Sequence, residues 1–456
     1  MTNSIFIFRR DYRLVDNTGL IECCKNSENV FPLFIFTPEQ ITNKNDYKSD
    51  NAVQILVGSL LELKEEIESN GGKFNICFGD NIKVLTEIIK NNKIDAIYFN
   101  KDYTPYSKKR DNDIKKLCKD KDISFNDFDD LLLYPVNSVL SKTGNPYTKF
   151  SFYFKEALKQ KIEKPQRLNK YNFNSKYLDS KYKINKTKME SFYNKNDNLY
   201  IEAGRSNAIK ILNSITKMKD YNKNRDLPKI GNSYLSSHIR FGNVSIRECY
   251  WKFVDKLGKK NQIVDQLYWN CFYTELGNNF PDMYKKRYMI EKFKDIKWDK
   301  STKLFNAWKE GKTGFPLSDA GMREMNTTGF MHNRVRMTSA TLLSRVLLLD
   351  WRMGEKYFSQ TLVDHVRSNN EGNWFWVVGT ANHSQVYFRI MSEWSQIKRF
   401  DPDCEYIKKW IPELKDVPAK DILKWNEKHE NYDDVEYPSP IVDDKVNKKE
   451  SIERYK

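Results

Sequence analysis

The chain has 456 residues, of which 30% are charged and 14% aromatic, and its formal net charge is +16. The aromatic content excludes a largely disordered protein, and the lack of any apolar run of 18 residues excludes a membrane-spanning helix. The basic excess favours a polyanionic partner, nucleic acid before an acidic membrane, with a composition rich in Lys and Asn as the alternative cause.

The first third of the chain alternates between strand and helix patterns. Short apolar runs, typical of buried parallel strands, lie at 4–8, 30–36, 74–78 and 94–99. Helical periods lie between them at 51–69 and 81–92. This alternation predicts an α/β domain with a Rossmann-like parallel sheet over residues 1–134. The dinucleotide fingerprint GxGxxG is absent after the first strand, where RRDYRLVDN stands at 9–17.

The rest of the chain loses the strand pattern. Residues 135–200 are polar and rich in Lys, Asn, Tyr and Ser, which predicts a long connector. Helical periods dominate from 201 to 435 and predict an all-α C-terminal half; the clearest lie at 247–257, 264–277, 318–326, 331–350 and 354–366. Residues 436–456 form a charged tail that we expect to fray.

Cysteine and histidine patterns point to an intracellular, soluble protein without a metal site. The seven cysteines form no CxxC pair, and the five histidines form no HExxH or similar motif. The chain begins with a strand pattern and no signal peptide. Its composition fits many hosts, including large viruses.

The stretch TGFMHNRVRM at 328–337 carries the first candidate site. Asn333, Arg336, Met337 and Ala340 share one face of the predicted helix. Arg336 on a mostly apolar helix needs an acid, and Asp364 is a candidate. The alternative is a purely structural salt bridge.

Two further patterns have both a structural and a functional interpretation. Four tryptophans, Trp298, Trp351, Trp374 and Trp376, fall in the helical half, where core packing is the ordinary role of any one of them. The stretch GNSYLSSHIRFG at 231–242 precedes a helical run, so it is either a plain N-cap or a phosphate-binding helix start.

Taken together, these stretches resemble the photolyase/cryptochrome family, and most closely its class I cyclobutane pyrimidine dimer photolyases. FIFRRDYRLVDN at 6–17 matches the N-terminal signature of the family. Further matches occur in family order over residues 3–420, at 309–337, 350–358, 369–376, 387–390 and 399–414. The resemblance implies an N-terminal α/β antenna domain and an all-α domain that binds FAD in a bent form.

The resemblance also implies roles for individual residues. The expected cofactor-binding residues are Tyr221, Asn232, Ser233, Tyr234, Leu235, Ser236, Arg336, Asp364, Val366 and Asn370, the last facing flavin N5. The expected electron-transfer chain runs from Trp374 through Trp351 to Trp298. The expected contacts to DNA or to the lesion are Arg225, Gln266, Trp269, Asn333, Arg334, Met337, Trp376 and Gln396.

The function implied is light-dependent DNA repair, in which excited reduced FAD transfers an electron to a cyclobutane pyrimidine dimer. UV-damaged DNA is the expected partner of a monomer with no obligate protein partner. The alternatives are a (6-4) photolyase, a cryptochrome-type photoreceptor without repair activity, and a DNA-binding protein that has lost flavin. A second antenna chromophore stays open between folate, deazaflavin and none, because Thr104 replaces a Glu that holds folate in the family.

Departures from the family pattern bear on the choice of lesion. Gln266 stands where cyclobutane-dimer enzymes typically carry Glu, and an amide supplies neither a proton nor a full charge. Asn333 and Met337 stand where (6-4) enzymes carry His, so their acid–base chemistry lacks a donor. Val366 replaces a second Asp near the flavin, and Ile263 replaces an aromatic residue. The two missing histidines outweigh the one amide and favour cyclobutane dimers.

Overall fold

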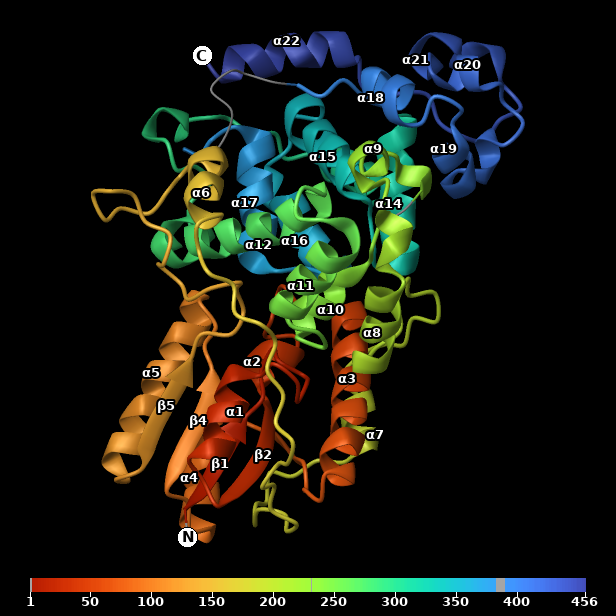
Figure 1. Cartoon of the computed structure of the whole chain (residues 1–456). Helices are drawn as coiled ribbons and strands as arrows, with labels where there is room; N and C mark the ends of the chain where they lie inside the picture. The colour runs from red at the N-terminus through yellow and green to blue at the C-terminus, as the bar shows by residue number, and fades with distance from the viewer. Residues whose placement is uncertain (1, 231, 383–389) are drawn as a thin grey trace.

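A computed structural model describes residues 2–230, 232–382 and 390–456 (Figure 1). A parallel five-stranded sheet of order β3-β2-β1-β4-β5 forms the N-terminal half, with α1 (Thr18–Lys25), α2 (Pro38–Ile41), α3 (Asp50–Ser69), α4 (Asn81–Asn91) and α5 (Pro105–Asp120) around it. The strands are β1 (Asn3–Ile7), β2 (Asn29–Phe36), β3 (Asn75–Phe78), β4 (Ala96–Asn100) and β5 (Ser124–Phe128). The predicted α/β fold is confirmed, and β5 is an addition to it.

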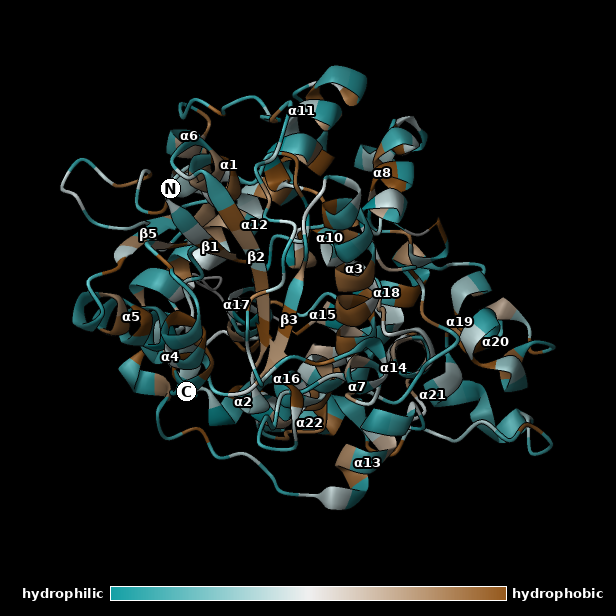
Figure 2. Cartoon of the chain, turned by 90° about the horizontal axis from the view of Figure 1, so that it is seen from below, coloured by the Kyte–Doolittle hydropathy of each residue, from teal (hydrophilic) through white to brown (hydrophobic). Residues whose placement is uncertain are grey.

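Alternation along the strands fills both sides of the sheet. Phe6 and Phe34 point into one buried cluster, with α3, and Ile5 and Leu33 point into the other, with α4 and α5. Successive side chains of a strand face opposite ways, so a run without polar residues is buried on both faces. Figure 2 shows the apolar residues along β2 and α3.

The connector is anchored to the sheet. It contains α6 (Phe150–Ala157) and α7 (Lys186–Glu190), and isolated bridges join Phe173 to Val30 of β2 and Lys183 to Cys77 of β3. The chain thus returns past the sheet before it enters the helical half (Figure 1).

The described part of the helical half contains helices and no named strand. Its α-helices are α8 (Arg205–Asn213), α9 (Tyr221–Asn224), α10 (Leu235–Phe241), α11 (Ile246–Leu257), α12 (Gln262–Asn279), α13 (Thr302–Glu310), α14 (Pro316–Thr328), α15 (Asn333–Thr341), α16 (Trp351–Thr361), α17 (Arg367–Val378), α18 (Glu393–Phe400), α19 (Glu405–Trp410), α20 (Ala419–Ile422), α21 (Trp425–Lys428) and α22 (Asp444–Arg454). Among the described residues, none of the helices is both long and apolar enough to cross a bilayer.

Two predicted helices are shorter than their apolar patterns. The one expected over 331–350 begins after His332, whose ring accepts from the Arg334 amide, and passes into a π-helical turn, Leu342–Val346. The one expected over 354–366 ends at Thr361. Residues 362–366 therefore form a loop, and Asp364 lies on that loop.

The charged tail does not fray, so that prediction is wrong. Helix α22 packs against the π-helical turn, and the Asn447 amide donates to the Val346 carbonyl at 2.8 Å. Tyr455 is buried, with 8% of its surface exposed, and lies 3.9 Å under the Arg345 guanidinium. These few contacts are enough to hold the segment against the helical half despite its high content of charged residues.

Buried ion pairs join the two halves. Arg247 of α11 donates to Asp16 at 2.9 Å and to Asp130 at 2.8 Å, and both acids belong to the N-terminal half. The cost of removing these charges from water is offset here because each charge has a partner of opposite sign. The carboxyl ends of the strands are thereby held against the helical half.

Candidate functional site

A cleft of about 530 Å³ lies in the helical half, and we call it the central cleft. Helix α15 contributes Asn333, Arg336, Met337 and Ala340, which confirms that these four residues share a face. Its other walls come from α16, the 362–366 loop and α17, through Phe358, Leu362, Asp364, His365, Val366, Asn369, Asn370, Asn373, Trp374 and Val377. Asn333 and Asn373 are exposed and mark its mouth.

The predicted pair of Arg336 and Asp364 lies in this cleft. Arg336 Nη2 is 3.0 Å from Asp364 Oδ2, and the Ser236 hydroxyl donates to the same oxygen at 2.8 Å. Asp364 Oδ1 is buried and has no partner among the described residues. A buried oxygen without a donor suits a ligand that carries an N–H group.

Asn370 is held by a buried acid. Its amide nitrogen donates to Glu355 Oε1 at 3.0 Å, and the Tyr47 hydroxyl donates to Glu355 Oε2 at 3.0 Å. Burial, with a further contribution from the charge of Glu371, raises the pKa of Glu355 to about 7. Because the nitrogen of Asn370 is engaged, its carbonyl oxygen is the group left for a ligand in the cleft.

The 232–236 segment reaches the cleft only at its end. Tyr234 is left-handed, with φ +57°, and the Ser233 hydroxyl accepts weakly from the Leu235 amide at 3.5 Å. Ser236 joins the cleft through its bond to Asp364. Tyr221 and residues 232–235 are not among the described residues that line it, and Gly231 lies outside the described residues.

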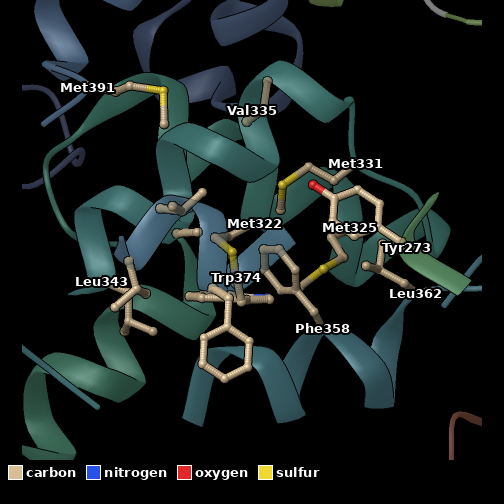
Figure 3. Packing of buried hydrophobic residues seen from close by; sticks show 14 of the residues in the cluster. Tyr273, Met322, Met325, Met331, Val335, Leu343, Phe358, Leu362, Trp374 and Met391 are labelled. Carbon is tan, nitrogen blue, oxygen red and sulfur yellow. The ribbon is translucent and has the colours of Figure 1, made fainter. Parts of the chain in front are cut away.

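Two of the three tryptophans of the expected electron-transfer chain are in ring contact. Trp374 and Trp351 stack with ring centroids 6.4 Å apart. Trp374 is buried beside Phe358 at 5.2 Å (Figure 3). Gly354 makes this possible, since a β-carbon there would lie 2.5 Å from Trp374 Cη2.

Trp298 is the third residue of the expected electron-transfer chain. It is half-buried, and its ring meets Tyr455 edge-on at 6.3 Å. The next residue, Asp299, pairs by its backbone with the Leu348–Leu349 segment just before Trp351. This pairing places Trp298 beside the N-terminus of α16.

The residues expected at the lesion are only partly gathered at the cleft. Asn333 and Met337 line it, whereas Gln266 and Trp269 on α12 and Trp376 on α17 do not. Gln266 donates to the Gln262 carbonyl at 3.1 Å. One face of Trp269 stacks on Phe150 of the connector, with centroids 3.5 Å apart.

The remaining DNA-contact candidates already have protein partners or lie inside. Arg225 donates to Gln262 Oε1 at 3.1 Å, and Arg334 pairs with Asp226 at 2.8 Å. Gln396 on α18 is buried. Residues 387–389 of the YFRI motif lie outside the described residues.

A second and larger cleft, about 1240 Å³, lies where the carboxyl ends of β1 and β2 face the helical half. We call it the cationic cleft, because its lining residues include Arg9, Arg10, Lys48, Arg110, Arg240 and Arg367. Arg9 Nη2 and Arg110 Nη2 are buried and have no hydrogen-bond partner among the described residues, whereas Arg9 Nη1 and Arg110 Nε pair with Asp111 at 2.7 Å and 2.9 Å. Burial, and next the charge of Arg110, lower the pKa of Arg9 to about 9.

The two clefts share a wall. His365 and Val366 line both of them. Burial and the nearby Arg240 and Arg367 hold the pKa of His365 well below its usual range, so the ring is neutral. Its Nε2 is buried and has no partner among the described residues.

Sequence reasoning missed Glu355, Tyr47, Phe150 and Asn373. Glu355 lies inside the matched stretch 350–358, but nothing local shows that Tyr47, more than 300 residues away, binds it. The cationic cleft had one available signal, RRDYR at the end of the first strand, since open parallel sheets bind ligands at that edge.

Comparison with known proteins matches two family models to most of this chain. A family model described as DNA photolyase matches residues 4–169, and one described as the FAD binding domain of DNA photolyase matches residues 263–456. A deoxyribodipyrimidine photo-lyase from Alkalihalophilus pseudofirmus is 32% identical over 98% of this chain and 97% of its own. The second model covers most of the helical half, which confirms FAD as the cofactor.

Two solved structures share the whole fold. An archaeal photolyase from Sulfolobus tokodaii, with two FAD molecules and the implication of a novel light-harvesting cofactor, has a TM-score of 0.89 and 36% identity, and covers 100% of this chain and 99% of its own. A class III photolyase from Agrobacterium tumefaciens has a TM-score of 0.91 and 27% identity, with coverages of 100% and 97%.

Proposed function

Because this chain belongs to the DNA photolyase family, we propose that it repairs cyclobutane pyrimidine dimers in UV-damaged DNA with the energy of light. The observation that carries the proposal is the meeting of Arg336, Asp364 and Asn370 at the central cleft, against the stacked pair Trp374 and Trp351. When bound, reduced FAD supplies the excited-state electron that opens the cyclobutane ring and then takes it back.

The chain's own residues bind and orient. Asp364 Oδ1 and the Asn370 carbonyl oxygen are acceptors for N–H groups of a flavin ring, and Arg336 supplies a positive charge beside them. The stacked tryptophans can pass an electron toward the cleft from the direction of Trp298. We further propose that the enzyme acts as a monomer without a protein partner.

The choice of lesion rests on the mouth of the cleft. Asn333 and Met337 are the α15 residues there, and neither carries a titratable proton. A (6-4) photoproduct needs acid–base chemistry, whereas opening a cyclobutane ring needs only an electron. This supports the cyclobutane dimer over the (6-4) photoproduct.

We further propose that the cationic cleft holds a second, phosphate-bearing chromophore. Both guanidinium groups share Asp111, yet each keeps a buried Nη2 with no partner among the described residues, and such N–H donors suit a phosphate because the charge-assisted bond offsets their desolvation. This favours a nucleotide-type or deazaflavin antenna over folate. Purified protein should then hold FAD plus a second chromophore, and Arg110→Ala should lose only the second.

The first experiment is to illuminate the chemically reduced protein with blue light on two oligonucleotides, one with a thymine cyclobutane dimer and one with a (6-4) photoproduct. Repair of the first alone is the expected result. Repair of the second alone would assign the enzyme to (6-4) photoproducts. Repair of neither, with FAD bound, would indicate a cryptochrome-type photoreceptor.

A further inference from the structure

We propose that Asn373, on α17, is a specificity-determining residue that binds the polar edge of the flipped pyrimidine dimer. The inference rests on the proposed function and deepens it. It starts from the lining of the central cleft, which includes three asparagines besides Asn370, namely Asn333, Asn369 and Asn373. Asn373 is exposed and lies one helical turn beyond Asn370 on the same face of α17.

The amide of Asn373 is held in place from both ends. The Tyr273 hydroxyl donates to its Oδ1 at 3.2 Å, and its Nδ2 donates to the Asn369 carbonyl at 2.8 Å. Side-chain rotation is therefore restricted before any substrate arrives. A polar group fixed in advance loses little conformational entropy when it binds a ligand.

The amide still has capacity for a ligand. A side-chain amide has two N–H donors and two acceptor lone pairs, and the two bonds use one of each. One N–H and one lone pair remain. Each pyrimidine ring of a thymine dimer presents an imide N–H next to a carbonyl oxygen, which is the complementary set.

Tyr273 ties this amide to the aromatic wall of α12. Its ring stacks on Trp269 with centroids 5.7 Å apart, and the other stacking partner of Trp269 is Phe150. Gly372 lets α17 approach this ring, since a β-carbon there would lie 2.4 Å from Tyr273 Cδ1. The aromatic row and Asn373 are thus placed as one unit.

Gln266 cannot make the same contact as it stands. It is absent from the described lining of the cleft, and one of its N–H groups is engaged by the Gln262 carbonyl. Asn373 lies in the lining and faces the space between the floor of the cleft and solvent. The polar contact with the lesion thereby shifts from α12 to α17.

The test measures the affinity of the FAD-bound enzyme in the dark, for an oligonucleotide with one thymine dimer and for the same oligonucleotide undamaged. Asn373→Ala should weaken binding of the damaged oligonucleotide about 3- to 10-fold and leave binding of the undamaged one unchanged. The rate of flavin photoreduction should not change. Equal loss on both oligonucleotides, or no loss on either, would overturn the proposal.

A second variant separates recognition from a folding defect. Tyr273→Phe keeps the ring on Trp269 and removes only the hydroxyl, so it should weaken dimer binding by less than Asn373→Ala, and the double variant should match Asn373→Ala alone. Additive losses would contradict the hydrogen-bonded unit. Tyr357→Phe is the matched control, because its hydroxyl donates to Asn326 Oδ1 at 2.8 Å away from the cleft. Dark binding is measured without light, so failed repair by the wild type would count against the proposed function alone.

Discussion

Trp351 stacks on Trp374 at a centroid distance of 6.4 Å, with the two ring planes 23° apart. Trp374 lines the central cleft, and Trp351 is fully buried behind it. A second indole, that of Trp308, also meets Trp374, at 6.5 Å and 65°. The cleft thus has two candidate routes for an electron, and only the first leads toward Trp298.

Trp374→Phe should slow photoreduction of oxidised flavin at least about tenfold and leave repair by pre-reduced enzyme within about twofold, because ring opening draws its electron from the flavin rather than from the indole. Light-driven bleaching of the flavin absorbance measures the first rate, and product analysis measures the second. Trp308→Phe serves as the comparison. An equal loss of photoreduction in Trp308→Phe would reject the Trp351 route.

Asp364→Asn should weaken FAD binding about 10- to 100-fold, since it removes the partner of Arg336 and one charge-assisted bond at the floor of the cleft. The apo form should lose only about 1–2 kcal/mol of its free energy of unfolding, because Arg336 is 24% exposed and solvent screens it. Flavin titration and thermal unfolding check the two effects. Glu405→Gln, at the exposed pair with Lys229, should change neither. Full FAD affinity in Asp364→Asn would remove this pair from the site.

The shifted pKa of Glu355 sets the direction in which the stability of the fold changes with pH. Its pKa rises from the ordinary value near 4.5 to about 7 on folding, so between these values the folded state holds a proton that the unfolded state has lost. Stability from this group therefore falls as pH rises from about 4.5 to 7 and stays low above, by at most about 3 kcal/mol.

Glu355→Gln should flatten that part of the stability profile, because Gln has no titratable proton, while its one oxygen can accept from Asn370 and its N–H can donate to the Tyr47 hydroxyl. Chemical unfolding at pH 5 and pH 8 compares the two proteins. A variant with the same pH slope as the wild type would show that Glu355 titrates normally in the folded chain.

Gln266→Glu should raise the affinity for dimer-containing DNA about 3- to 10-fold, since a carboxylate cannot donate to the Gln262 carbonyl, is free to turn toward the lesion, and accepts an imide N–H more strongly than an amide does. Dark binding and repair yield per photon both measure it. Gln360→Glu, on the exposed face of α16, is the control for added negative charge. Unchanged affinity and yield would mean that another group holds the thymine.

Tyr455→Ala should lower the free energy of unfolding by about 3 kcal/mol, since the buried ring fills the space beside Phe293 and Trp298. Ile452→Ala, on the helix that Tyr455 directly follows, should cost far less, because Ile452 is 42% exposed. Equal and negligible losses would mean that the tail is detached in solution. Chemical unfolding of both variants decides this.

The residue pattern predicted the fold correctly for strands that are buried on both faces of the sheet. The β1 and β2 runs are apolar on both faces, so their sequence alone marks them as inner strands. The β5 strand was missed because SFNDF lies at the sheet edge and is half-exposed. The prediction that the tail frays was wrong because the tail is held by contacts with residues more than 100 positions away, such as Val346 and Asp299.

The site was predictable where chemistry demands a partner. Arg336 on an apolar helix called for an acid, and Asp364 supplies it. The hydrogen bond from Asn370 to Glu355 was not predictable from the sequence. A buried carboxylate is compatible with many donors, and which donor binds it depends on how α16 and α17 pack together. The role of Tyr273 likewise depends on the approach of α12 to α17.

The wall shared by the two clefts makes them one thermodynamic system. His365 and Val366 line both spaces, so a ligand that favours one arrangement of this loop from one cleft would change the free energy of binding in the other. Linkage requires the effect to be equal in both directions. A chromophore that tightens FAD binding must itself be held more tightly once FAD is present, and titrating either one with and without the other reads the same coupling.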